Sequence, residues 1–143
     1  PMAEAFQQVY IGAEKFIANN PNSFPPIVIN ITDGEPNNFN TAISEAKKLM
    51  QLSTSDGKLI LMNAHISAAT GGKVELPSNN SGFQGNKFAE FLFDISSALP
   101  DTLANKAKDV GFNVQPNAKG FVFNADAETL VRLLNFGSLG ALS

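Results

Sequence analysis

The chain has 143 residues, of which 43% are hydrophobic, and this is enough to bury one core, so a single domain is expected. Its 13 acidic and 10 basic residues form no long block of either sign, which argues against a nucleic-acid partner. The absence of cysteine excludes disulfides, thiolate metal sites and a cysteine nucleophile, and it leaves the compartment open, with the cytoplasm favoured. No apolar run approaches the roughly 20 residues of a membrane span.

An amphipathic helix is expected directly after Pro1. A proline suits a first helical turn, because the N–H that it lacks has no partner there. The apolar residues that follow recur at the spacing of one helical face: Ala5, Phe6, Val9, Tyr10, Ala13, Phe16 and Ile17. Polar residues at 19–22 end this helix and lead into a first strand.

The segment Pro25–Pro36 carries the clearest local signal, with the sequence Pro-Pro-Ile-Val-Ile-Asn-Ile-Thr-Asp-Gly-Glu-Pro. Its β-branched residues are apolar at odd and even positions alike, which is typical of a strand buried on both faces in a parallel sheet. Ligands of open α/β sheets bind outside the carboxyl ends of the strands, so Asp33 stands where chemistry is usually found. An ordinary exit from a strand into a turn explains the same residues, and both interpretations stay open.

A second helix and a second strand follow. Capping groups at 37–40 precede an apolar stripe of Ala42, Ile43, Ala46, Leu49 and Met50, and this helix is expected to end near Ser53. The turn Asp56-Gly57 then leads into a mostly apolar strand, Lys58–Ile66. The only histidine, His65, lies at the end of that strand. It is either a ligand or base near Asp33 or a histidine hydrogen-bonded at a strand terminus, and the second interpretation is favoured because no second histidine accompanies it.

The stretch 67–85 is rich in Ser, Asn and Gly and predicts a long loop near the binding edge. Helical spacing returns in one helix with Phe88, Phe91, Leu92, Ile95 and Leu99, and in another that Pro100 starts and Gly111 stops. The aromatic residues of the first of these helices are expected to pack in the core and not to stack on nucleic-acid bases.

A third strand, Gly120–Asn124, precedes a closing helix that Asp126 caps. The core face of this helix is predicted to consist of Leu130, Val131, Leu133 and Leu134, with its end at Gly137. No dinucleotide-binding or phosphate-binding glycine motif is present. Two helical crossovers predict that Lys58–Ile66 lies between the other two strands, with all three parallel.

Three segments together resemble the second half of a bacterial von Willebrand factor type A (VWA) domain. They are Ile31-Thr-Asp-Gly-Glu-Pro36 after an apolar strand, the strand Lys58–Ile66, and the ending from Gly120 to Ser138. The resemblance covers essentially residues 1–143 and implies a doubly wound, Rossmann-like α/β fold. It also implies a metal-ion-dependent adhesion site, which this family builds from three loops, and Asp33 matches the aspartate of the third loop.

The resemblance further implies that Asp33 binds a cation such as Mg²⁺, Mn²⁺ or Ca²⁺, with Glu35 and Thr32 as possible supporting groups. Thr32 is the weaker of these, since neighbouring side chains of a strand point to opposite faces. The implied function is that of a non-enzymatic module that recognises an exposed acidic residue of a protein ligand. The alternative is a small α/β phosphoacceptor or hydrolase-like domain that uses Asp33, for which Lys73 and Lys119 are the lysines nearest the strand edges.

The chain also departs from the family pattern, because no Asp-x-Ser-x-Ser occurs in it. Pro1-Met2 resembles the start of the helix that follows the family's metal-binding threonine, so residues 1–143 match the carboxyl-terminal portion of one such domain. The amino-terminal half, including the strand that lies beside the Asp33 strand in this family, is then expected from elsewhere. Either a larger domain has been cleaved or truncated, or another chain completes a native half-domain. The first explanation is favoured, because a break one residue after a functional threonine would be a strange natural start. With one carboxylate in place, this chain is expected to bind divalent ions in the millimolar range or more weakly.

Overall fold

The computed structural model describes residues 1–67 and 72–142, and the side chains up to residue 138. In chain order the elements are α1 (Met2–Asn19), β1 (Ile27–Thr32), α2 (Phe39–Gln51), β2 (Ser53–Thr54), β3 (Gly57–Lys58), β4 (Ile60–Ile66), β5 (Val74–Glu75), α3 (Lys87–Asp94), α4 (Asp101–Asp109), β6 (Phe121–Ala125) and α5 (Ala127–Leu142). The main sheet has the order β1-β4-β6-β5, while β2 and β3 form a separate antiparallel hairpin.

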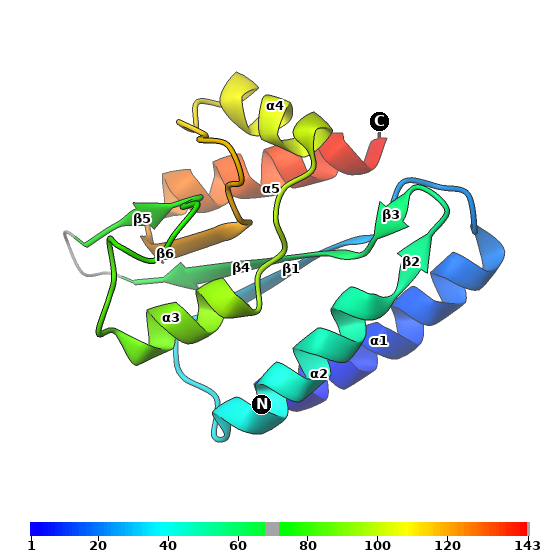
Figure 1. The fold of residues 1–143 in the computed structure, drawn as a ribbon, viewed down its shortest axis with the longest axis horizontal. Coiled ribbons are helices and arrows are strands. Elements are labelled where there is room, and N and C mark those ends of the chain that lie inside the picture. The colour runs from blue at the N-terminus through cyan, green and yellow to red at the C-terminus, as the bar shows by residue number, and fades with distance from the viewer. Residues whose placement is uncertain (68–71, 143) are drawn as a thin grey trace.

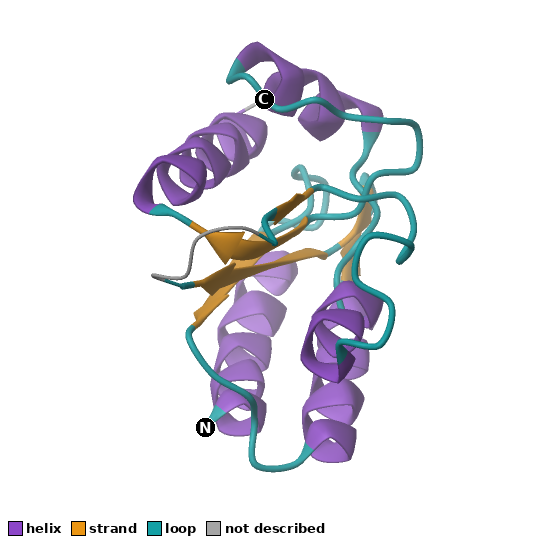
Figure 2. Cartoon of the chain, turned by 90° about the vertical axis from the view of Figure 1, so that its left-hand side faces the viewer, coloured by secondary structure: helices purple, strands orange, loops and turns teal. Residues whose placement is uncertain are grey.

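The molecule has three layers, with the main sheet in the middle (Figure 1). Helices α1, α2 and α3 cover one face and α4 and α5 cover the other, as Figure 2 shows from the side. Each face has its own hydrophobic core: Leu61 of β4 packs with the first group of helices, and Met62 of the same strand packs with the second. Because successive side chains of a strand point to opposite faces, β4 contributes to both cores and is buried from Ile60 to Ala64.

The predicted strand order is confirmed. Strand β4 lies between β1 and β6, and it pairs with both in parallel. The chain is therefore an α/β protein with a mostly parallel central sheet flanked by helices, an arrangement compatible with a Rossmann-like fold. The fourth strand, β5, falls in the stretch 67–85 that was expected to be a loop, and it pairs with β6 in the antiparallel sense. Residues 68–71 of that stretch lie outside the described residues.

The prediction that the first strand is covered on both faces is confirmed only in part: Val28 packs against one core and Ile27 and Ile29 pack against the other, but none of the three is fully buried. Strand β1 pairs only with β4 and forms an edge of the sheet. Its residues are half-buried, and Ile31 keeps 44% of its surface exposed. Apolar residues do occur at odd and at even positions of this strand, but nothing in the described chain covers its outer side.

The closing helix also differs from its prediction. Asp126 caps α5 as expected, but the helix continues past Gly137. A Cβ at Gly137 would lie 3.1 Å from Ile29 Cδ1 and 3.1 Å from Met62 Cε, so this glycine allows close packing of the helix on the sheet and does not end the helix. Two residues assigned to its core face, Val131 and Leu134, are 55% and 38% exposed.

The other helices match their predictions with smaller differences. Asn38 accepts a hydrogen bond from Thr41 N and caps α2, and Asn86 accepts one from Ala89 N and caps α3. Helix α3 ends at Asp94, earlier than the apolar spacing through Leu99 suggested. No helix that the structure describes is both long and apolar enough to cross a membrane.

Candidate functional site

Asp33 follows β1 directly and lies at the carboxyl edge of the parallel strands. Its side chain is exposed, and within the described chain its carboxylate makes no hydrogen bond or ion pair. It lines two neighbouring hollows. One, of about 420 Å³, lies between residues 30–37 and the start of α1 at Pro1, Met2 and Ala5. The other, of about 450 Å³, is mostly apolar and lies between Asp33 and the start of α5. The geometry leaves this carboxylate available to a ligand.

Thr32 and Glu35 have different roles around Asp33. The Thr32 hydroxyl donates to Gly34 O at 2.7 Å and accepts from Gly34 N at 3.2 Å, so it holds the turn that presents Asp33. The Glu35 side chain is exposed and lines the same hollow as Asp33. Of these two candidates, Thr32 is therefore bound to the backbone of its own turn, while Glu35 lies exposed in the hollow that Asp33 lines.

His65 lies level with Thr32 on the neighbouring strand. Its Nδ1 accepts a hydrogen bond from the backbone N–H of Asn124 at 3.1 Å. The imidazole ring stacks on Phe123 with 4.2 Å between ring centroids and meets Phe88 edge-on. Burial lowers the pKa of His65 below its usual value, and the nearby charge of Asp33 opposes that shift. His65 is thus a neutral acceptor that joins β4 to β6, as the favoured interpretation of the sequence had it.

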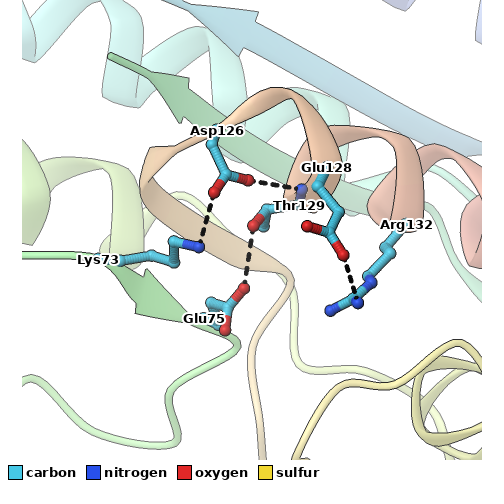
Figure 3. A network of polar contacts seen from close by, with 6 residues as sticks. All are labelled: Lys73, Glu75, Asp126, Glu128, Thr129 and Arg132. Carbon is cyan, nitrogen blue, oxygen red and sulfur yellow. Dashed lines mark hydrogen bonds and ion pairs between the residues drawn. The ribbon is translucent and has the colours of Figure 1, made fainter. Parts of the chain in front are cut away.

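A polar network surrounds the start of α5 (Figure 3). Asp126 accepts from Thr129 N at 2.8 Å and from Lys73 Nζ at 2.9 Å, while Thr129 Oγ1 donates to Glu75 at 3.2 Å. The bond from Thr129 N, together with Lys73, holds the pKa of the Asp126 carboxyl far below its usual range. The sequence predicted the capping role of Asp126 but not its pairing with Lys73, which lies 53 positions away.

The two lysines named for a phosphoacceptor both have partners. Lys73 is paired with Asp126, as described above. The Lys119 ammonium lies 4.2 Å from the centroid of the Phe93 ring, and burial lowers its pKa. Each cation is engaged by a group other than Asp33.

The residues around Asp33 do not make up a complete cation site. In the described parts of the chain, no three His, Cys, Asp or Glu side chains are grouped so that they could hold a metal ion. Mg²⁺ prefers six oxygen ligands and gives up its waters reluctantly, so one free carboxylate with Glu35 nearby supplies only part of a shell. Any tighter site needs oxygen atoms from outside these residues.

Searches against protein-family models, curated proteins and solved structures found no match to this chain.

Proposed function

We propose that this chain is part of a VWA-like binding module in which Asp33 supplies one ligand to a divalent cation. The observation that carries the proposal is the free Asp33 carboxylate at the carboxyl end of β1, an edge strand with an open outer side. In the resembled family the remaining ligands come from the strand next to this one and from a further loop. The order β1-β4-β6 leaves the place of that strand open.

Binding of a protein ligand at the Asp33 site is favoured over catalysis there. A cation held partly by Asp33 and partly by water keeps positions for an acidic side chain of a protein ligand. The groups that could assist catalysis are engaged elsewhere: His65 Nδ1 accepts from Asn124, and Lys73 is paired with Asp126. No specific observation favours the phosphoacceptor alternative.

The proposal predicts weak but localised binding of divalent ions to the chain by itself. We expect Mn²⁺ to broaden the NMR signals of residues 32–37 and of the end of β4, with a dissociation constant in the millimolar range, because few of its waters are replaced. Asp33→Asn should abolish the broadening and leave the melting temperature nearly unchanged, since an exposed carboxylate without partners contributes little to the apo fold.

Asp56→Asn is the matched control. Asp56 is also an exposed carboxylate that precedes a glycine, and its turn is also held by a threonine, since Asp56 N donates to Thr54 Oγ1 at 3.2 Å. It lies in the β2–β3 hairpin, beside the start of β4 (Figure 1). Broadening of equal strength around Asp33 and Asp56, or broadening that survives Asp33→Asn, would mean that Asp33 belongs to an ordinary turn.

A further inference from the structure

Two Asp-Gly pairs occur in the chain, Asp33-Gly34 and Asp56-Gly57, and no Asn-Gly pair occurs. An aspartate before a glycine can rearrange without an enzyme, because the backbone nitrogen of the glycine can attack the side-chain carboxyl carbon and close a five-membered ring. Glycine favours this step, since it has no Cβ to obstruct the approach of its nitrogen. Ring closure requires rotation of the aspartate, so the folded structure decides which of the two pairs reacts.

The loop after β1 leaves the Asp33-Gly34 pair free to rotate. Both residues are exposed, and the Asp33 carboxylate has no hydrogen bond or ion pair within the described chain. In the same part of the chain, the Gly34 N–H bonds only to the Thr32 hydroxyl, at 3.2 Å, which is the long end of the usual range. Apart from its chain neighbours, no residue has an atom within 4 Å of the position that a Cβ would take at Gly34. One weak contact therefore restrains the attacking nitrogen.

The Asp56-Gly57 pair is held by the β2–β3 hairpin. Gly57 belongs to β3 and pairs with Thr54 of β2. Asp56 N donates to Thr54 Oγ1 at 3.2 Å, and Thr54 Oγ1 donates to Ser23 O at 2.6 Å, which ties the turn to the segment before β1. Rotation of Asp56 would disturb these contacts together, so this pair reacts only when the hairpin opens.

We propose that Asp33-Gly34 is a site of spontaneous isomerisation to isoaspartate and that Asp56-Gly57 is protected from it. In the first step the Gly34 nitrogen forms a bond to Cγ of Asp33. One carboxylate oxygen leaves as water, with the amide proton and one proton from the solvent. In the second step water adds to the backbone carbonyl carbon of Asp33 and breaks its bond to the Gly34 nitrogen. The oxygen of this water stays in a new carboxylate, one hydrogen returns to the Gly34 nitrogen, and one proton returns to the solvent.

The product differs from Asp33 in its backbone and in the place of its charge. The main chain gains one atom, because Cβ of this residue becomes part of it, and the new carboxylate is attached to Cα instead of Cβ. The modification would therefore inactivate any site that uses the Asp33 carboxylate. The inference rests on the two turns alone, and it holds whether or not Asp33 binds a cation.

The test incubates the full chain in EDTA at neutral pH, so that a failure of cation binding at Asp33 cannot affect the result. Isoaspartate is measured over time in proteolytic peptides that contain Asp33 or Asp56. Electron-transfer fragmentation identifies it, because this method cleaves the Cα–Cβ bond that isoaspartate places in the main chain. The same incubation in guanidinium chloride gives the rate of each pair in the unfolded chain.

We expect the two pairs to react at similar rates in the unfolded chain, where the hairpin no longer protects Asp56. In the folded chain, isoaspartate should form about tenfold faster at Asp33 than at Asp56, because only the second pair depends on a local opening. The unfolded rates show how much of this difference comes from the fold and how much from the neighbouring residues.

Gly34→Ala tests the role of the glycine itself. The φ of Gly34 lies outside the left-handed region and open space surrounds it, so alanine fits there without strain. The added methyl group obstructs the nitrogen, and isoaspartate should form at Asp33 about tenfold more slowly. Gly82→Ala is the matched control, since Gly82 is another exposed loop glycine with open space around it, and it should leave the Asp33 rate unchanged.

Three results would overturn the proposal. The first is a rate at Asp56 in the folded chain that equals or exceeds the rate at Asp33. The second is a folded chain that forms no isoaspartate at Asp33 during an incubation that converts the unfolded chain. The third is a Gly34→Ala variant that keeps both the melting temperature and the Asp33 isomerisation rate of the unmodified protein.

Discussion

At the scale of single residues, buried and half-buried polar side chains connect neighbouring elements of the sheet and its helices. Asn63 joins β1 to the end of α3, and His65 joins β4 to β6 where their register shifts. Asn124, which donates to His65, has a φ of +54°, an uncommon value for a residue other than glycine. These contacts cluster toward the carboxyl edge, where the candidate site lies.

The contact between His65 and Asn124 predicts a dependence of stability on pH. Protonation of Nδ1 would remove the acceptor, and burial already lowers the pKa of His65 in the folded state below 6.5. The unfolded chain therefore binds the proton more readily. The contribution to stability is fully present above pH 6.5 and is lost as the pH falls from 6.5 toward the folded-state pKa.

Urea unfolding at a series of pH values between 8 and 5 would measure this effect, and the His65→Phe variant should flatten the curve in that range. Asp126 contributes little to this range, because the pKa of its carboxyl is lowered in the folded state and its contribution to stability is lost only as the pH falls through its unfolded-state value of 3.8 and below. A stability that is constant from pH 8 to pH 5 in the unmodified protein would contradict the role given to His65.

At the scale of elements, glycines mark where one element approaches another closely. Gly120 precedes β6, and a Cβ there would lie 2.5 Å from Met62 Cγ and 3.2 Å from Met62 Cβ. Met62 has no exposed surface, and these atoms are at the root of its side chain, so they cannot move away easily. Gly12, in the middle of α1, is the opposite case, because nothing lies within 4 Å of the position that a Cβ would take there.

Substitution by alanine should therefore have opposite effects at these two glycines. Gly120→Ala should destabilise the fold by about 2 kcal/mol through overpacking. Gly12→Ala should stabilise it by about 0.5–1 kcal/mol, since alanine is the better helix former. Paired urea titrations would show both changes, and a stability unaltered by Gly120→Ala would mean that Met62 can repack.

At the scale of the whole molecule, the sheet order predicts a gradient of local stability. Strand β4 is paired on both sides and lies between two cores, whereas the outer side of β1 is open. The amides of β4 should exchange most slowly, at rates set by global unfolding. The amides of Ile27, Ile29 and Ile31 should exchange fastest among those in the strands of the main sheet. Residue-resolved hydrogen exchange would test this order, and equal protection of β1 and β4 would contradict it.

Local signals in the sequence were sufficient for the α/β class, for most helix positions and for the parallel order of the three main strands. Helical spacing, the caps at Asn38 and Asp126, and the crossover lengths act over short distances along the chain, so they can be read from it. The place of Asp33 at the carboxyl end of a strand follows from the same signals, because a strand and the turn that ends it are adjacent in sequence.

Only the tertiary structure decided which apolar residues are covered and which polar groups meet. The run Ile27–Thr32 reads as a buried strand, but its exposure depends on whether a neighbour pairs with its outer side. Gly137 reads as a helix stop, but the helix continues through it, and the glycine lets α5 pack closely against Ile29 and Met62. The bonds between Asn30 and Asn63 and between Lys73 and Asp126 join residues 33 and 53 positions apart. Spacing along the chain carries no information about such contacts, because the packing of the sheet and helices brings these residues together.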